Sequence, residues 1–363
     1  MGRTEEKTFP QVVTGSPAKY LPQLDGVRAV AVLVVLAHHA SVPLMKGGYL
    51  GVDVFFVLSG YLITAILLRE LSATGALRLF PFYAKRALRL FPALITVSAA
   101  VALVWALLDW APNRQDTLLG VPVAITYFSS WVRAFDINTL GSMGHTWSLA
   151  VEEHFYLVWP LVLILMFKLT RNPRMAVLIA AAIGIAYRLA APVLFGWDTE
   201  RIYSGSDTQA AQILIGCLLA AWLHETSVRV RAVPAVIAAL GVGTAVVLLP
   251  LHSAFYLHGG ALLVGLATAV VIAHLVTAQT QPMSRILQRK TLTWIGVRSY
   301  GIYLWHFPIF GLLAASGLPT LAVAGLSAAL SFAIPALSYR FIESPILKQK
   351  KRFHTNLGAS VKA

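Results

Sequence analysis

One apolar segment contains two ionisable side chains, Arg28 and His39, whose types and spacing could support binding of an anion and transfer of a proton. The segment reads LDGVRAVAVLVVLAHHA and carries them eleven positions apart. On an α-helix this separation is about 1100° of rotation and a rise of roughly 16 Å, so both side chains fall on one stripe. His38 points about 80° away from Arg28, which makes His39 its better partner. In the alternative interpretation, Arg28 reaches the headgroups and His39 bonds a neighbouring helix.

Carboxylates follow in two further apolar segments. Asp53 lies in GGYLGVDVFFVLSGYLI, and Glu152 and Glu153 lie in HTWSLAVEEHFYLVWP. Ionisable groups inside apolar segments are costly and are functional candidates by default. The two glutamates point about 100° apart on a helix, so only one readily faces a given cavity. We expect Asp53 and Glu152 to lie near His39, where a carboxylate would orient the imidazole and raise its basicity.

A pair of arginines lies in the segment FYAKRALRLFPA. Arg86 and Arg89 are three residues apart, about 60° around a helix, so both guanidinium groups can converge on one anion. Arginine forks suit the oxygens of phosphate groups. The alternative is a pair of basic anchors at the inner membrane edge, which is the commoner reason for such residues.

The segment SYGIYLWHFP near the end of the chain places Tyr300, Tyr303 and His306 on a three-residue step. Tyrosines at such depths are also common in the aromatic belts of membrane proteins. A buried cation, Arg188, has no partner that the sequence identifies. Further candidate site residues are Ser59, His145, Glu153, Tyr303 and His306.

The elements that must position these residues are apolar helices. Of the 363 residues, 58% are hydrophobic and only 12% are charged, with a mean hydropathy of +0.72. A soluble domain carries roughly 25% charged residues, so a soluble enzyme, a nucleic-acid-binding domain and a disordered chain are excluded. The single cysteine, Cys217, excludes a disulfide framework and a thiolate-rich metal site, and no metal is predicted. The sequence therefore predicts an all-α, polytopic membrane protein.

About ten transmembrane helices are expected. They are predicted at 27–44, 49–68, 88–108, 148–169, 175–195, 209–223, 233–250, 257–276, 299–315 and 319–341. A shorter apolar run, 117–131, contains glycine, proline, threonine and serine and is predicted to be re-entrant or superficial. The net charge of +14 gathers in alternate loops, as the positive-inside rule requires, if 117–131 does not span and both termini are cytoplasmic.

Three regions follow from this topology. Residues 1–20 form a cytoplasmic N-terminal tail without the apolar core of a signal peptide. Residues 21–347 form the transmembrane domain, and residues 348–363 form a basic cytoplasmic tail.

Taken together and in their order along the chain, the motifs resemble the acyltransferase-3 family of integral membrane O-acyltransferases. The matching pieces are LDGVRAVAVLVVLAHH, GGYLGVDVFFVLSGYLI, the RALR pair, HTWSLAVEEHFYLVWP, SYGIYLWHFP and YRFIESP, which together extend over residues 21–346. The resemblance implies a bacterial cell-membrane enzyme that takes an acyl group, usually acetyl, from cytoplasmic acyl-CoA. The implied acceptor is a hydroxyl of a sugar, polysaccharide, lipid-linked sugar or macrolide-type natural product. No permanently bound cofactor is implied.

The resemblance also implies residue roles. Arg28, Arg86 and Arg89 fall on the positions that hold the CoA phosphates. His39 falls on the essential histidine, as general base or as acyl carrier, and Glu152 falls on the glutamate of the WSLxVE stretch. Two departures are expected to matter: Gln209 stands where many members have arginine, and no extracellular SGNH-hydrolase-like domain is expected after the last span. The rival interpretation is a secondary transporter or flippase for a polyprenol-linked or secreted product.

Overall fold

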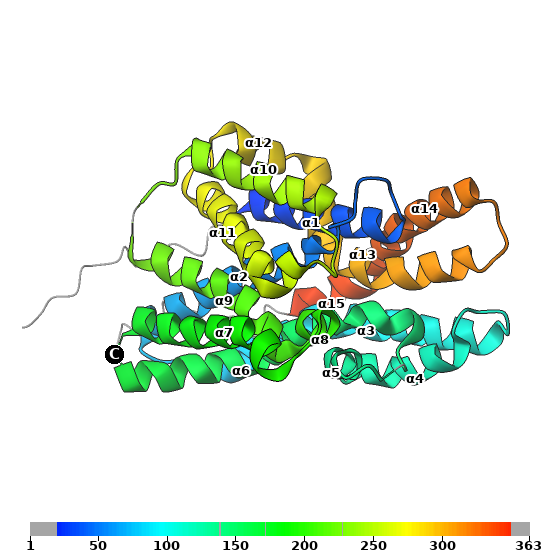
Figure 1. Ribbon diagram of the computed structural model, residues 1–363, viewed down its shortest axis with the longest axis horizontal. Helices are drawn as coiled ribbons and strands as arrows, with labels where there is room; N and C mark the ends of the chain where they lie inside the picture. Colours follow the sequence, from blue (N-terminus) through cyan, green and yellow to red (C-terminus); the bar gives the residue numbers. More distant parts are fainter. Residues whose placement is uncertain (1–19, 138, 171, 227, 350–363) are drawn as a thin grey trace, which may run out of the picture.

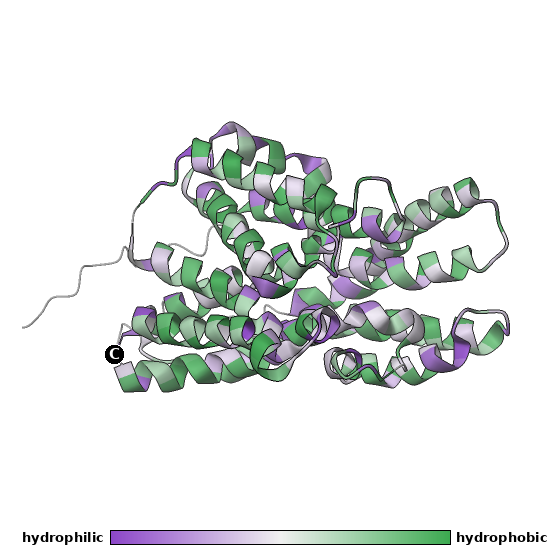
Figure 2. Ribbon diagram, viewed as in Figure 1, coloured by the Kyte–Doolittle hydropathy of each residue, from purple (hydrophilic) through white to green (hydrophobic). Residues whose placement is uncertain are grey.

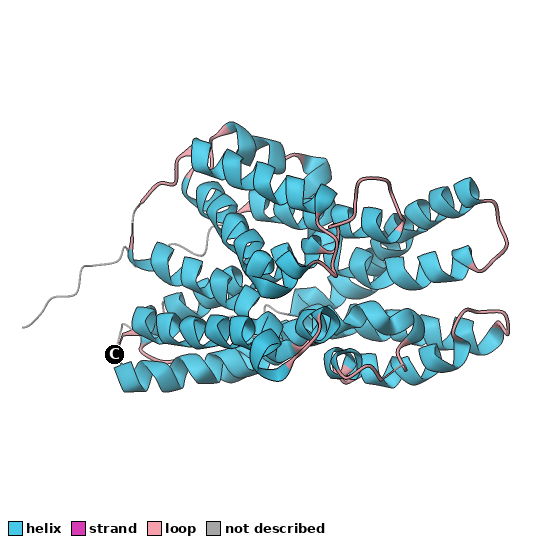
Figure 3. Cartoon of the chain, in the orientation of Figure 1, coloured by secondary structure: helices cyan, strands magenta, loops and turns pink. Residues whose placement is uncertain are grey.

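The computed structural model of the chain describes residues 20–349, apart from residues 138, 171 and 227. Within this part of the chain every regular element is a helix and no strand occurs, which confirms the all-α prediction (Figure 3). The two predicted tails, 1–20 and 348–363, lie almost wholly outside the described residues, and their placement stays a prediction.

Each of the ten predicted apolar segments contains a helix. These helices are α1 Pro22–His39, α2 Leu50–Thr74, α3 Leu79–Leu107, α6 Trp147–Thr170, α7 Pro173–Phe195, α9 Ser206–Glu225, α10 Ala232–Leu248, α11 Ala261–Thr277, α13 Lys290–Ala314 and α14 Thr320–Ser338. Shorter helices lie between or after them: α4 Arg114–Ile125, α5 Ser129–Ala134, η1 Gly141–Thr146, α8 Thr199–Ser204, η2 Tyr256–Gly260, α12 Pro282–Leu287, and, after α14, η3 Tyr339–Glu343 and α15 Ser344–Lys348.

Six helices of the described residues are long and apolar enough to cross a membrane. They comprise α2, α3, η1 with α6, α7, η2 with α11, and α14 with its two short extensions. Hydrophobic residues run along the long helices in Figure 2. The chain is therefore a multi-pass membrane protein, whereas the count of ten spans and the cytoplasmic placement of both termini stay predictions.

The apolar run at 117–131 is interrupted. Helix α4 ends at Ile125, helix α5 begins at Ser129, and Tyr127 in the turn between them has a φ of 60°. The 12 residues of α4 rise about 18 Å, which is shorter than the roughly 30 Å of a bilayer core. The break agrees with the prediction that this run does not span.

Close packing joins helices that are far apart in the sequence. In Figure 1, α6 and α10 lie on opposite sides of the molecule, with α2 and α9 between them. Helices α2 and α9 cross at Gly60 and Gly216: a Cβ atom added to Gly60 would overlap the carbonyl of Ile213, and one added to Gly216 would overlap that of Val57. Small residues at such crossings let two backbones touch. On the other side of α2, helix α1 packs against both α2 and α13.

Candidate active site

Three histidines meet where α1, α13 and η1 come together. The Nε2 atom of His306 lies 3.2 Å from Nδ1 of His39, and the ring centroids of His145 and His306 are 5.5 Å apart. His306 and His145 are buried, while His39 at the end of α1 is partly exposed. His39 is thus the member of this histidine cluster that a substrate can reach.

Hydrogen bonding sets the tautomers of the neutral rings. Nδ1 of His306 lies 2.5 Å from the carbonyl oxygen of Tyr303, and a carbonyl only accepts, so this nitrogen donates. Nε2 of His306 then carries a lone pair and accepts a hydrogen bond from Nδ1 of His39. The remaining nitrogen of His39, Nε2, is left with its lone pair. The series of hydrogen bonds from the Tyr303 carbonyl through His306 to His39 therefore leaves Nε2 of His39 as a basic nitrogen at a partly exposed position.

A second layer of contacts holds the histidine cluster in place. Nε2 of His145 donates to the carbonyl of Leu304 at 3.1 Å, and the ring of Phe307 stacks on that of His145 with centroids 5.1 Å apart. The hydroxyl of Tyr303 donates to the carbonyl of His145 at 3.0 Å and bonds the hydroxyl of Ser148 at 2.7 Å. These contacts attach η1 and the start of α6 to α13, and so fix the ring of His306.

The prediction that a carboxylate orients His39 is wrong. Among the described residues, His39 bonds His306 and the backbone of Val35. Glu152 instead accepts a hydrogen bond from Ser59 at 2.7 Å, and Asp53 lies 3.5 Å from the hydroxyl of Tyr256. His39 is the last residue of α1 rather than one turn inside its helix, and the position of a residue along a helix does not specify the side on which a partner packs.

Three arginines gather at the other end of α1, as predicted. Arg28 pairs with Asp25 at 3.3 Å, and Arg86 lies 3.6 Å from Glu153 with its guanidinium 3.1 Å above the ring of Tyr156. The charge of Arg89 interacts with those of Arg28 and Arg86. Unlike Arg28 and Arg86, Arg89 has no ion pair in the described part of the chain, so its guanidinium is the one in this arginine cluster best suited to an added anion.

The paired glutamates face different partners, as the helix arithmetic predicts. Glu153 faces Arg86, whereas Glu152 is bonded to Ser59 of α2 and feels the charges of Arg86 and Arg28. Both glutamates therefore belong to the surroundings of the arginine cluster rather than to those of His39.

Two residues near these clusters were missed from the sequence. Tyr127, in the turn between α4 and α5, lies beside Tyr300, and both interact with Glu153. Arg133 of α5 pairs with Glu200 of α8 and lies 5.6 Å from the ring of Trp147, and its charge acts on His39. A basic residue in a loop otherwise poor in basic residues was the one signal that pointed to Arg133.

Residues 21–340 match the sequence model of a family described as an acyltransferase domain. This chain belongs to the acyltransferase-3 family. It is 37% identical over 352 residues to the peptidoglycan O-acetyltransferase OatA of Listeria monocytogenes serovar 1/2a (strain EGD-e), covering 91% of this chain and 56% of that protein. It is 32% identical over 369 residues to the O-acetyltransferase OatA of Staphylococcus aureus (strain NCTC 8325), covering 95% of this chain and 60% of that protein. The chain thus spans less than two thirds of the length of these relatives, and no solved structure matches it.

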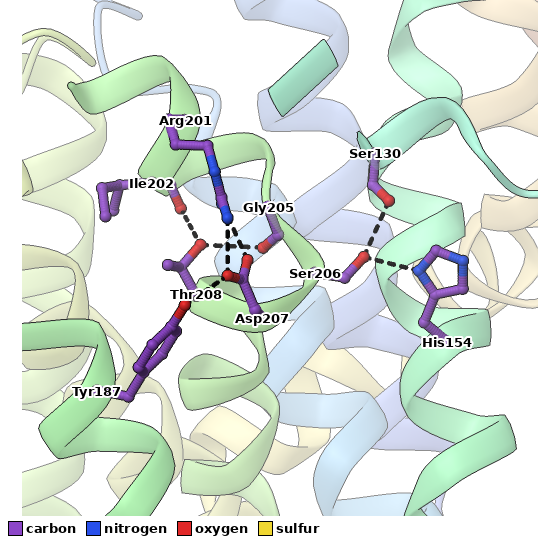
Figure 4. A network of polar contacts seen from close by, with 9 residues as sticks. All are labelled: Ser130, His154, Tyr187, Arg201, Ile202, Gly205, Ser206, Asp207 and Thr208. Carbon is purple, nitrogen blue, oxygen red and sulfur yellow. Dashed lines mark hydrogen bonds and ion pairs between the residues drawn. The ribbon is translucent and has the colours of Figure 1, made fainter. Parts of the chain in front are cut away.

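Gln209, which the resemblance predicts to stand where many family members have arginine, follows a strongly bonded corner between α8 and α9. Arg201 donates twice to Asp207 at 2.9 and 2.8 Å, and Thr208 donates to the carbonyls of Ile202 and Gly205 (Figure 4). Other bonds in Figure 4 tie the corner to neighbouring elements: Tyr187 to Asp207, and Ser206 to Ser130 and His154. These bonds hold the start of α9 in place, and with it the backbone position of Gln209.

Proposed function

We propose that the chain transfers an acyl group, most simply acetyl, from acyl-CoA to a hydroxyl of a carbohydrate acceptor. The observation that carries this proposal is the layout of α1. One end of the helix contributes Arg28 to a cluster of three arginines in which Arg89 has no ion pair among the described residues, and the other end contributes His39 with its tautomer set by hydrogen bonds. The two ends are separated by a rise of roughly 16 Å, a distance that the pantetheine arm of CoA can bridge.

In the proposed reaction, Arg28, Arg86 and Arg89 hold the phosphates of CoA through charge-assisted hydrogen bonds. The acceptor hydroxyl donates to Nε2 of His39, which takes the proton as the oxygen attacks the thioester carbonyl. The tetrahedral intermediate collapses, the carbon–sulfur bond breaks, and the CoA thiolate leaves and takes the proton from the His39 imidazolium, which restores the neutral ring. His306 stabilises the imidazolium because its Nε2 lone pair accepts the hydrogen bond from Nδ1 of His39.

The same nitrogen also suits the alternative in which His39 carries the acyl group. Nε2 of His39 would then attack the thioester, and the acceptor hydroxyl would displace the acyl group from the imidazole in a second step. The two routes differ in one intermediate. In the absence of acceptor, an acyl-enzyme forms only if His39 carries the acyl group.

The acceptor and the setting are further parts of the proposal. One relative is named a peptidoglycan O-acetyltransferase, which supports a bacterial glycan or its lipid-linked precursor as acceptor. We place the chain in the bacterial cell membrane with ten spans, both termini cytoplasmic and the arginine cluster on the cytoplasmic side. Acyl-CoA would then enter from the compartment that contains it.

Transfer of label from acetyl-CoA tests the proposal. Purified protein in lipid nanodiscs is incubated with radiolabelled acetyl-CoA and a muramyl disaccharide, and labelled disaccharide is separated by chromatography. We expect label in the disaccharide and none with the His39→Ala variant. A transporter or flippase would move its substrate without forming this product, so absence of labelled disaccharide with folded protein contradicts the proposed reaction.

A further inference from the structure

A buried polar cluster that the proposed chemistry does not use lies among α2, α7 and α9. Its members are Asp53, Arg188, Gln209 and Gln212, and each is 0% exposed. All four have unused hydrogen-bonding atoms: Oδ2 of Asp53, Nε and Nη2 of Arg188, and Oε1 of both glutamines have no partner among the described residues. Buried polar atoms are nearly always bonded, so a group of exceptions in one place requires an explanation.

Three members of this polar cluster, Asp53, Gln209 and Arg188, interact with the tyrosine Tyr256. The hydroxyl of Tyr256 lies 3.5 Å from Oδ1 of Asp53 and 3.3 Å from Nε2 of Gln209. Arg188 lies 5.8 Å from the Tyr256 ring and donates to the neighbouring carbonyl of Leu257 at 3.2 Å. The charges of Arg188 and Asp53 act on each other, and Asp53 also interacts with Gln212. The unused atoms therefore belong to side chains of one shared site.

Aromatic rings line the polar cluster on the side of the histidines. Tyr49 lies 5.6 Å from Tyr203 and 5.4 Å from Tyr256, and Tyr203 lies 4.5 Å from Trp147, measured between ring centroids. The ring of Tyr49 is also 6.0 Å from that of His38, the neighbour of His39. The polar cluster thus borders the end of α1 where transfer is proposed, and not the end that carries the arginine cluster.

We propose that Asp53, Arg188, Gln209 and Gln212 bind the hydroxyl groups of the sugar acceptor. A carboxylate and two carboxamide oxygens accept from hydroxyls, and a guanidinium donates to them, so both halves of each hydroxyl are satisfied. The opposite charges of Asp53 and Arg188 compensate each other, which suits a neutral polyhydroxyl ligand better than a phosphate. Tyr49, Tyr203 and Tyr256 pack edge to face against one another and form an aromatic wall beside these polar groups, of the kind that suits the apolar side of a sugar ring. This inference rests on the proposed acyl transfer and specifies its acceptor site.

Two leucine variants test the site without introducing a charge. Gln209→Leu and Gln212→Leu remove two amide groups of the polar cluster at similar side-chain volume; their Nε2 atoms also donate to the carbonyls of Tyr203 at 2.8 Å and Ala261 at 2.7 Å. The matched control is Gln23→Leu, because Gln23 is equally buried but already bonded on both sides, to the carbonyl of Leu275 and to Gln288. Thermal unfolding in nanodiscs shows which variants are folded. Because two cluster variants are made, the test can still be carried out with one of them if the other misfolds.

Two measurements are made on each protein with the muramyl disaccharide as the probe. Saturation-transfer NMR without any donor reports binding, and acetyl transfer from acetyl-CoA reports KM for each substrate. We expect each cluster variant to weaken disaccharide binding and raise the acceptor KM about three- to tenfold, the value of one neutral hydrogen bond, with the acetyl-CoA KM unchanged. The Gln23→Leu control should bind the disaccharide like the parent.

The outcomes separate the two proposals. Parent-like disaccharide binding by both cluster variants overturns the sugar site, and so does failure of the parent to bind the disaccharide. Equal weakening in the Gln23→Leu control also overturns it, because the effect is then general. If the parent binds the disaccharide through these glutamines but no acetyl group is transferred from acetyl-CoA, the proposed reaction fails while the site stands.

Discussion

The arginine cluster and the histidine cluster lie at opposite ends of helix α1 and differ in exposure, charge and hydrogen bonding. At the arginine cluster the side chains of Arg28 and Arg86 are 17% and 15% exposed, the charges are concentrated, and few hydrogen bonds restrain them. At the histidine cluster, His306 and His145 are buried and a continuous hydrogen-bond chain leads from Tyr303 to His39. The first arrangement suits an arriving anion, and the second suits a proton transfer whose geometry must not vary.

The difference shows how one helix can serve two tasks. A phosphate tolerates movement of its partners because charge attraction falls off slowly with distance. A general base must lie within hydrogen-bonding distance of the proton that it removes. We therefore expect substitutions in the two clusters to affect different kinetic constants, and the predictions below test that division from the largest effect to the smallest.

The largest effect is expected from His39→Ala. Loss of a general base costs about 10²–10⁴-fold in rate, and loss of an acyl carrier costs at least as much. Binding of acetyl-CoA, measured by equilibrium dialysis, should remain because the arginine cluster is intact. An active His39→Ala protein would remove His39 from the mechanism, and lost donor binding would remove the division between the clusters.

A smaller effect on the same constant is expected from His306→Phe. The variant keeps an aromatic ring in the buried position but removes the lone pair that accepts from Nδ1 of His39. A hydrogen bond to a charged group is worth about 1.5–3 kcal/mol, so kcat should fall about ten- to a hundredfold. The KM for acetyl-CoA should stay the same, and steady-state kinetics measure both constants. A parent-like kcat would show that His306 only fills space.

Arg86→Ala and Arg89→Ala should act on the other cluster and the other constant. Each removes a guanidinium from the proposed phosphate site, so the KM for acetyl-CoA should rise about tenfold while kcat changes little. Lysine at either position should restore the donor KM only in part, because it lacks the planar fork. Donor kinetics like those of the parent in both alanine variants would return the pair to the role of membrane anchors.

The smallest effect is expected from His38→Ala. Nδ1 of His38 bonds the carbonyl of Met45 at 2.8 Å, so its loss should lower the stability of the turn after α1 by about 1 kcal/mol. Acetyl transfer should be nearly unchanged, because the ring lies off the stripe that joins Arg28 to His39. Initial rates of His38→Ala and His39→Ala, compared side by side, decide between the adjacent histidines, and an inactive His38→Ala protein would reverse the assignment.

Local periodicity in the sequence was enough to predict much of this protein. The apolar runs predicted the ten long helices, and the interruption of the run at 117–131 followed from its length and its residues. The spacings of Arg28 with His39, and of Arg86 with Arg89, predicted which side chains share a stripe. Such predictions succeed because rise and rotation per residue are properties of a single helix.

Contacts between helices were decided by packing alone. The partner of His39 is His306, 267 residues further along the chain, and the buried Asp53 shares its site with Arg188 of another helix. Neither contact could be predicted from the spacing of the residues along the sequence. The rotation of one helix against another depends on which side chains allow their backbones to approach, as at Gly60 and Gly216, and this is a property of two surfaces together. The residue types and their stripes were therefore readable from the chain, whereas the partners across α1, α2, α9 and α13 existed only once those helices had packed.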